Sequence, residues 1–263
     1  MGRPVELVEW AEAQLRECRR IALRYFQHRM RVERKADRSP VTAADRAIEE
    51  LLRRRIGRAF PHDAIVGEEF GGTALAGGSY WTIDPIDGTR AFSRGLPSWG
   101  TLLGRVEHGR AIMGACSYPA IDTFIGAARG TGAYERVGSR CRRLPRAKAV
   151  RAIDETAIFH GGARWWLATP YARGLGQLMQ DCYLERAYGD CYAYLWVLRG
   201  RADAMIEYGV KVWDMVPFAA FADATGHTLT DFRGRPSFVG PDSLFAHPTL
   251  SRMIVRYLAP RRS

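Results

Sequence analysis

Three short acidic segments stand out in a chain that is otherwise strongly basic. They are Gly67-Glu68-Glu69, the run from Asp84 to Thr89, and Trp213-Asp214. Carboxylate and carbonyl oxygens are the ligands that hard divalent cations prefer in proteins. The three segments therefore suggest a site for divalent cations.

The second acidic segment combines two residues that restrict the backbone with two carboxylates. Pro85 fixes its own φ and holds Asp84 in extended geometry, while Gly88 permits a turn that other residues resist. Together they can direct Asp84, Asp87 and the carbonyl of Ile86 inward. Amides at the start of a following helix would then form an anion site for phosphate. An Asx-type turn at a strand end is the alternative explanation.

The elements that must position these residues follow from hydrophobic periodicity and turn signals. Apolar runs predict strands over 64–66 and 80–83, each ending at an acidic segment, and helical spacing predicts a helix over 213–224 with Asp214 as its N-cap. Carboxylates at such ends can converge on one cleft. A capping box over 42–45 predicts a further helix start. Other strands are expected over 99–107, 111–118, 122–128, 157–159 and 204–207, and other helices over 5–30, 173–180 and 192–199.

Length and composition bound the kind of protein. The chain has 263 residues, of which 47% are hydrophobic and 25% charged, as is typical of a soluble globular protein. No apolar run approaches the length that crosses a membrane, and the first residues lack an apolar signal region, so we expect a cytoplasmic protein without membrane attachment. Five cysteines without a CxxC pair disfavour disulfides and zinc. We expect one domain over 1–263 with two lobes, about 1–150 and 151–263.

The net charge of +11 raises an alternative of another class, a protein that binds RNA or a transcription partner. Only three of the 39 basic residues are lysine and asparagine is absent, which indicates the coding bias of a GC-rich genome. The chain has neither an RNP1-like motif nor aromatic residues interleaved with the basic ones, so nucleic acid is disfavoured as a partner. A positive field would still steer a small anionic substrate to the protein.

The motif from Trp81 to Thr89 resembles the first signature of the inositol monophosphatase family. The segments Gly67-Glu68-Glu69 and Trp213-Asp214 match its other two metal-binding motifs, and the run from Lys35 to Asp45 is similar to its N-terminal motif. The resemblance spans roughly residues 5–235. It implies an α/β protein with the layered αβαβα sugar-phosphatase fold, Mg²⁺ as cofactor and a homodimer.

The resemblance also implies a set of metal ligands. Glu68, Asp84 and the carbonyl of Ile86 would bind a first Mg²⁺. Asp84, Asp87 and Asp214 would bind a second. Two cations placed in this way would suit a displacement in which phosphate charge must be neutralised.

The remaining catalytic roles come from the same resemblance. Glu68 and Thr89 would position and activate the attacking water, with Asp45 supporting Thr89. The amides of Gly88 and Thr89 would bind the phosphate group. Thr89 is not expected to form a phosphoenzyme.

Three other stretches are more similar to the histidinol-phosphate phosphatase branch of the family than to its inositol branch. They are Gly67 to Gly71, Thr89 to Thr101 and Gly189 to Tyr192. In that branch, an acidic residue at the position of Asp190 would suit a substrate that carries an ammonium group. Glu207 matches a position that contacts the part of the substrate outside the phosphate, and Arg186 would line the same pocket.

The predicted substrate is therefore a small phosphorylated metabolite. The first hypothesis is L-histidinol phosphate, which would place the enzyme in histidine biosynthesis. The alternative from the same family is an inositol-1-monophosphatase or a phosphatase of many sugar phosphates.

Overall fold

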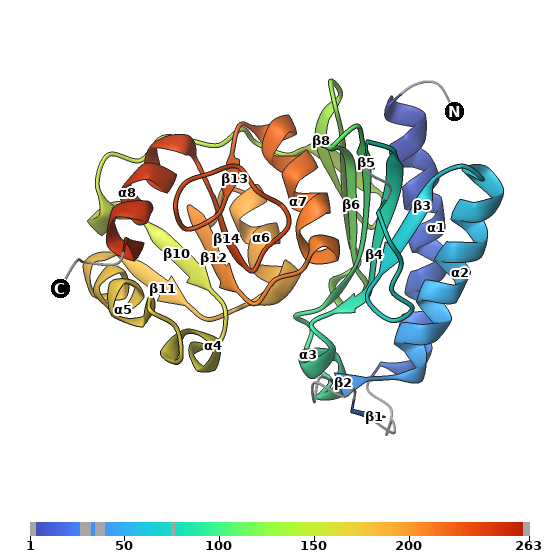
Figure 1. Cartoon of the computed structure of the whole chain (residues 1–263), viewed down its shortest axis with the longest axis horizontal. Coiled ribbons are helices and arrows are strands. Elements are labelled where there is room, and N and C mark those ends of the chain that lie inside the picture. Colours follow the sequence, from blue (N-terminus) through green and yellow to red (C-terminus); the bar gives the residue numbers. More distant parts are fainter. Residues whose placement is uncertain (1–3, 27–32, 35–39, 75–76, 260–263) are drawn as a thin grey trace.

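The computed structural model describes residues 4–26, 33–34, 40–74 and 77–259, and its helices and sheets are stacked in five layers (Figure 1). Two helices cover a seven-stranded sheet, and two further helices lie between this sheet and a five-stranded one. The last layer of helices covers the outer face of the second sheet. This order is the αβαβα architecture that the resemblance predicted.

The seven strands of the first sheet lie in the order in which they occur along the chain. The first two run parallel, and every later neighbouring pair is antiparallel. The strands predicted in this region are confirmed, but the last two were not predicted. The final strand is exposed at every residue and lacks apolar alternation. The strands are β3 (Ala64–Gly67), β4 (Ser79–Asp87), β5 (Gly100–Glu107), β6 (Arg110–Tyr118), β7 (Thr123–Ala128), β8 (Gly132–Val137) and β9 (Arg140–Arg143).

Helices α1 (Pro4–Tyr25) and α2 (Ala43–Ala59) cover the outer face of this sheet. Their apolar stripes pack around Trp81 of β4 in one core. A helix was predicted over 5–30, but α1 ends at Tyr25. Residues 27–32 lie outside the described part of the chain. α2 begins at the predicted capping box.

Helices α6 (Asp190–Leu198) and α7 (Val212–Thr225) lie between the two sheets. Both are apolar on nearly every side, as expected of helices that are buried on two faces. α7 lies close to the first sheet because Gly104 and Gly114 have no side chain, and a Cβ at either position would overlap α7. The helix ends at Gly226, whose φ of 77° lies in the left-handed region. This packing fixes where the first turn of α7 lies.

The second sheet has the strand order β11-β10-β12-β14-β13 and contains both parallel and antiparallel pairs.

No helix in the described ranges is long and apolar enough to span a bilayer. Residues 35–39 of the predicted N-terminal motif lie outside the described part, and the division into two lobes stays a prediction. The remaining elements are β1 (Glu33–Arg34), β2 (Pro40–Val41), α3 (Thr89–Ser93), β10 (Ala157–His160), α4 (Ala163–Leu167), α5 (Ala172–Asp181), β11 (Leu184–Arg186), β12 (Ala204–Tyr208), β13 (Thr228–Thr230), β14 (Asp242–Ala246) and α8 (Pro248–Leu258).

Candidate metal centre

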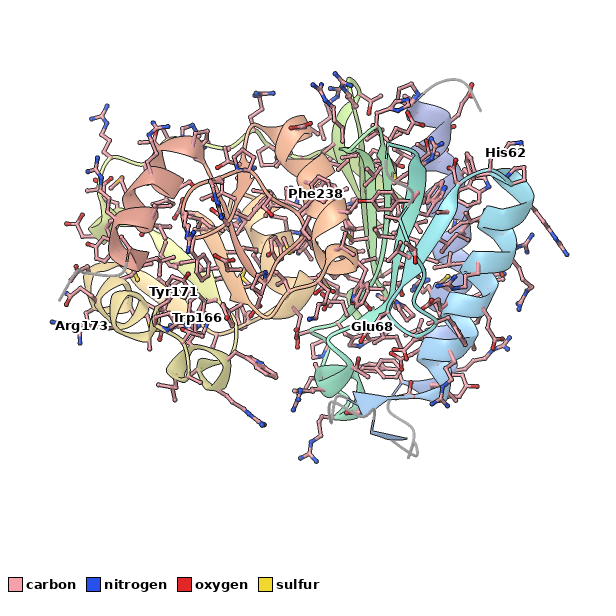
Figure 2. The ribbon with its side chains drawn as sticks, viewed as in Figure 1. His62, Glu68, Trp166, Tyr171, Arg173 and Phe238 are labelled. Atoms are coloured by element: carbon pink, nitrogen blue, oxygen red, sulfur yellow. The ribbon has the colours of Figure 1, made fainter. Side chains whose placement is uncertain are left out.

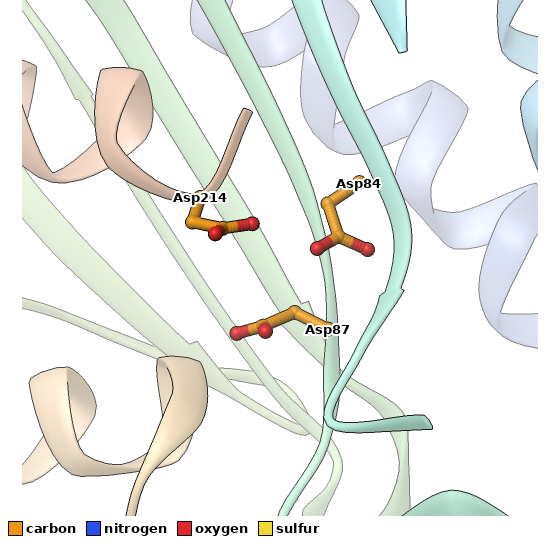
Figure 3. A group of neighbouring side chains, drawn as sticks. All are labelled: Asp84, Asp87 and Asp214. Atoms are coloured by element: carbon orange, nitrogen blue, oxygen red, sulfur yellow. The ribbon is translucent and has the colours of Figure 1, made fainter. Parts of the chain in front are cut away.

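The end of β4 carries a β-bulge that directs two carboxylates to one side. Asp84 pairs with Leu102 of β5, whereas Asp87, three residues later, pairs with Gly100, which is only two residues from Leu102. In a regular strand, residues three apart point to opposite faces, but the extra residue of a bulge reverses this alternation. β4 therefore presents Asp84 and Asp87 together (Figure 3).

The third carboxylate comes from the first turn of α7. Asp214 is the third residue of this helix, and its Oδ2 accepts a hydrogen bond of 2.7 Å from the amide of Lys211. The expectation that Asp214 is itself the N-cap is therefore wrong, because Lys211 has the extended backbone of the cap and Asp214 reaches back to it. This position keeps the carboxylate at the positive end of the helix dipole.

The three carboxylates converge on one point (Figure 3). One oxygen from each of Asp84, Asp87 and Asp214 lies within 4.8 Å of the other two. Asp84 is buried, and its Oδ1 has no hydrogen-bond partner among the described residues. A buried oxygen in this state costs free energy unless a ligand pairs with it. The donor set of close, hard oxygens therefore fits the divalent cation that the family resemblance implies.

Without a cation, the negative charges of the three carboxylates repel one another. Burial, followed by the charges of Glu68, Asp87 and Asp214, raises the pKa of Asp84 well above its ordinary value. Burial also raises the pKa of Asp87 and of Asp214, while amides at the starts of α6 and α7 act in the opposite direction. A bound cation would remove the unfavourable repulsion and stabilise the ionised carboxylates.

Glu68 lies in the turn after β3 (Figure 2). Its amide donates a hydrogen bond of 3.1 Å to the carbonyl of Ile83, the residue before Asp84. Its negative charge contributes to the raised pKa values of Asp84 and Asp214. Glu68 is not one of the three residues whose oxygens lie within 4.8 Å of one another, so its part in binding the first Mg²⁺ stays a prediction.

No hydrogen bond joins Asp45 to Thr89, both of which lie in the described part of the chain, and the support of Thr89 by Asp45 stays a prediction. The hydroxyl of Thr89 donates a hydrogen bond of 2.9 Å to the carbonyl of Ile86. Oδ2 of Asp45 instead accepts the amide and the hydroxyl of Thr42, because Thr42 is the N-cap of α2 and Asp45 completes its capping box. Asp45 is fully buried, and burial raises its pKa to about 6.

Gly88 makes the turn that leads from β4 into the short helix α3. Its φ of 89° lies in the left-handed region, and a Cβ there would lie 2.7 Å from the carbonyl oxygen of Ser98. The predicted need for glycine at this turn is confirmed. The binding of phosphate by the amides of Gly88 and Thr89, and of Mg²⁺ by the carbonyl of Ile86, remain predictions.

An acidic pair, Asp190 and Glu207, lies beside the cluster of three carboxylates. The amide of Asp190, the first residue of α6, donates a hydrogen bond of 3.2 Å to Oε2 of Glu207 on β12. Glu207 is buried, and burial followed by the charge of Asp190 raises its pKa well above the ordinary value. The side chain of Asp190 is exposed. The structure thus brings Asp190 and Glu207 together.

Arg186 lies apart from this pair. Its side chain is exposed on the edge strand β11, and its Nη1 donates a hydrogen bond of 2.6 Å to the carbonyl of Glu185. No hydrogen bond or ion pair joins Arg186 to Asp190 or Glu207, all of which lie in the described part of the chain. Its role in substrate binding stays a prediction.

Two residues that support the site were not singled out from the sequence. Gly161 leaves room for Glu207, because a Cβ on Gly161 would overlap Oε1 of that side chain. Glu49 is fully buried on α2, where its carboxylate contacts the turn that carries Glu68. The sequence offered one signal for Glu49: it lies four residues after Asp45, and residues so spaced share one helix face.

Comparison with known proteins places this geometry in a family. The model of the inositol monophosphatase family matches residues 4–261. Over 206 residues, the chain is 37% identical to a histidinol-phosphatase of Mycobacterium tuberculosis, an alignment that covers 78% of this chain and 79% of the relative. It is 33% identical to a histidinol-phosphatase of Chlorobaculum parvum, over 86% of this chain and 85% of that one.

The solved structures agree on the fold. An inositol monophosphatase from Zymomonas mobilis matches with a TM-score of 0.83 at 24% identity, and the match covers 98% of this chain and 99% of that one. The sequence, the fold and the carboxylate cluster therefore agree, and the chain belongs to the inositol monophosphatase family.

Proposed function

We propose that this phosphatase hydrolyses L-histidinol phosphate in histidine biosynthesis, with Mg²⁺ bound by Asp84, Asp87 and Asp214. The observation that carries metal-dependent hydrolysis is the convergence of these carboxylates around an oxygen of Asp84 that has no hydrogen-bond partner in the described ranges. Identities of 37% and 33% to two histidinol-phosphatases support the choice of substrate.

Thr89 and Glu68 have different roles toward the attacking water. When bound, divalent cations supply the positive charge that a phosphate group needs beside three carboxylates. Thr89 donates its only hydroxyl hydrogen to Ile86, so its oxygen can act on a water only as an acceptor. Glu68 then takes the proton that the water loses as its oxygen bonds to phosphorus. The ester bond breaks, and the leaving oxygen takes a proton from solvent.

The acidic pair Asp190 and Glu207 suits the ammonium group of the substrate. L-Histidinol phosphate carries an ammonium group near its phosphate ester, and a buried carboxylate without a cation favours such a partner. Glu207 is buried and has no ion pair within the described residues, and the charges of Asp190 and Asp87 act on it. Asp190 and Glu207 would therefore bind the ammonium group, while Arg186 would lie at the outer edge of the substrate.

A panel of pure substrates tests this proposal. Phosphate release with Mg²⁺ would be measured for L-histidinol phosphate, myo-inositol 1-phosphate and glycerol phosphate. We expect the highest kcat/KM for L-histidinol phosphate. Much faster turnover of myo-inositol 1-phosphate would remove the histidinol proposal and favour the inositol alternative, while leaving metal-dependent hydrolysis intact.

Two variants test the role of the acidic pair. Asp190→Asn suits the position, because Asp190 has a φ of 49° and asparagine tolerates this region. Glu207→Gln keeps an oxygen that can accept the amide of Asp190. Each variant should lower kcat/KM for L-histidinol phosphate by about 10- to 100-fold, because a charged partner is lost, and change that for glycerol phosphate little. Equal losses on both substrates would contradict binding of an ammonium group.

A further inference from the structure

Glu49 of α2 binds the backbone of the turn that carries Glu68. Its side chain is 0% exposed. Oε2 accepts a hydrogen bond of 2.7 Å from the amide of Glu69, and Oε1 accepts one of 3.2 Å from the amide of Phe70. Hydrogen bonds from successive amides to one carboxylate fix the orientation of the peptide groups between them.

Arg53, one helical turn later, extends this contact. Its Nε donates a hydrogen bond of 2.8 Å to Oε1 of Glu49, and its Nη2 donates one to the carbonyl of Gly71. The guanidinium also lies over the ring of Phe70, 5.9 Å from its centroid. The two side chains together hold three consecutive residues of the turn.

Gly67 and two backbone hydrogen bonds complete the attachment of the turn. Gly67 has no side chain, and a Cβ there would overlap Oε1 of Glu49, so glycine is what allows the carboxylate to come this close. The amide of Glu68 bonds to Ile83 of β4 at 3.1 Å, and the amide of Gly67 bonds to Gly71 at 3.0 Å. The backbone of Glu68 is therefore held from α2 on one side and from the strand of Asp84 on the other.

We propose that Glu49 and Arg53 are positioning residues, which act through the turn to hold Glu68 beside the metal centre. A buried ion pair adds little stability compared with apolar side chains of similar volume, so stability alone does not explain this pair. Apolar side chains could not accept the amides of Glu69 and Phe70. The inference rests on the proposed function, since it assigns to Glu68 a part in binding cations.

The experiment measures metal binding and backbone protection without substrate. Mn²⁺ serves as the probe, its dissociation constant is measured by electron paramagnetic resonance, and amide hydrogen exchange is followed across 67–71. The variants are Glu49→Gln and Arg53→Met. Glu135→Gln is the matched control, because Glu135 is also buried and paired with two arginines, Arg142 and Arg199, but lies on β8, five strands away from β3.

We expect Glu49→Gln and Arg53→Met to raise the Mn²⁺ dissociation constant by about 10- to 100-fold and to speed exchange in the turn. The control should lower the melting temperature but change Mn²⁺ affinity less than about twofold. If Glu49→Gln does not fold, the double variant Glu49→Gln/Arg53→Met leaves no buried charge unpaired and gives the same readout.

The outcomes separate this inference from the proposed function. Unchanged Mn²⁺ affinity and unchanged exchange in both variants would overturn the positioning role. If the wild-type protein bound no Mn²⁺, the proposed function would fail, and amide exchange across 67–71 would still decide whether the pair holds the turn.

Discussion

Asp87 of β4 accepts a hydrogen bond from the backbone amide of Cys191, the second residue of α6. One carboxylate thereby joins the end of the first sheet to a helix buried between the two sheets. Asp214 stands in the first turn of α7, so the positive ends of two helices meet at the cluster. These helix ends favour anions, and the three carboxylates favour cations, which is the combination that a site for a metal and a phosphate needs.

Replacing Asp87 with asparagine isolates the charge from the hydrogen bond, since an asparagine oxygen can still accept the amide of Cys191. We expect Asp87→Asn to fold and to lose at least about 100-fold in kcat/KM with Mg²⁺. Asp122→Asn is the control, because Asp122 is exposed and its φ of 49° suits asparagine. Activity of Asp87→Asn near that of the control would contradict a ligand role for Asp87.

The raised pKa values make the stability of the metal-free protein depend on pH. Burial raises the pKa of Asp87 and of Asp214 from 3.8 to about 7. A carboxyl group with a raised pKa binds its proton more tightly in the folded state, so its stabilising effect is complete below pH 4 and is lost as pH rises through about 7. In EDTA, the melting temperature of Asp87→Asn relative to wild type should therefore increase between pH 5 and pH 8.

Added Mg²⁺ should reduce this difference, because a cation stabilises the ionised carboxylates. Thermal unfolding at both pH values, with EDTA or with Mg²⁺, checks both statements. The same difference between wild type and Asp87→Asn at pH 5 and pH 8 would count against the carboxylate repulsion described above.

His227 gives a pH dependence of the opposite sign. Burial lowers its pKa from 6.5 to about 4, with a smaller contribution from His247, and its ring stacks on Phe245 at 4.7 Å. A histidine with a lowered pKa stabilises the fold above pH 6.5, and this effect is lost as pH falls toward 4. Urea unfolding at pH 7 and pH 4.5 should show wild type losing up to about 3 kcal/mol more than His227→Gln. Equal losses in both proteins would show that folding does not lower the pKa of His227.

Gly161 tests whether the position of Glu207 matters for the substrate. A Cβ at Gly161 would overlap Oε1 of Glu207, so Gly161→Ala must displace that carboxylate. We expect KM for L-histidinol phosphate to rise about tenfold, while Mn²⁺ affinity stays within about twofold of wild type. Gly176→Ala is the control, since a Cβ at Gly176 meets nothing within 4 Å. An unchanged KM would remove Glu207 from the substrate site.

The family resemblance predicted the layered fold, whereas the turn that carries Asp84 and Asp87 was predicted from local information. The strand before Asp84, Pro85 and the glycine turn at Gly88 lie within one short run, and each restricts the backbone by its own chemistry. The bulge between Asp84 and Asp87 was not predicted, because it depends on pairing with Gly100 of another strand.

Other features needed contacts between distant segments. Glu49 lies 20 residues before the amide that it binds, and from the sequence it was one acid on an amphipathic helix beside the exposed Glu50. Thr89 bonds to the carbonyl of Ile86, and Oδ2 of Asp45 bonds to Thr42. Hydrophobic periodicity carries no information about the hydrogen-bond partners of Glu49 or Thr89.

The most direct test of the central claim is phosphate release by protein stripped of metal. L-Histidinol phosphate would be supplied to protein treated with EDTA, and Mg²⁺ would then be added in increasing amounts. If Asp84, Asp87 and Asp214 hold the cations that hydrolysis requires, release should be at background in EDTA and rise to saturation with Mg²⁺. Full turnover in EDTA would contradict the account.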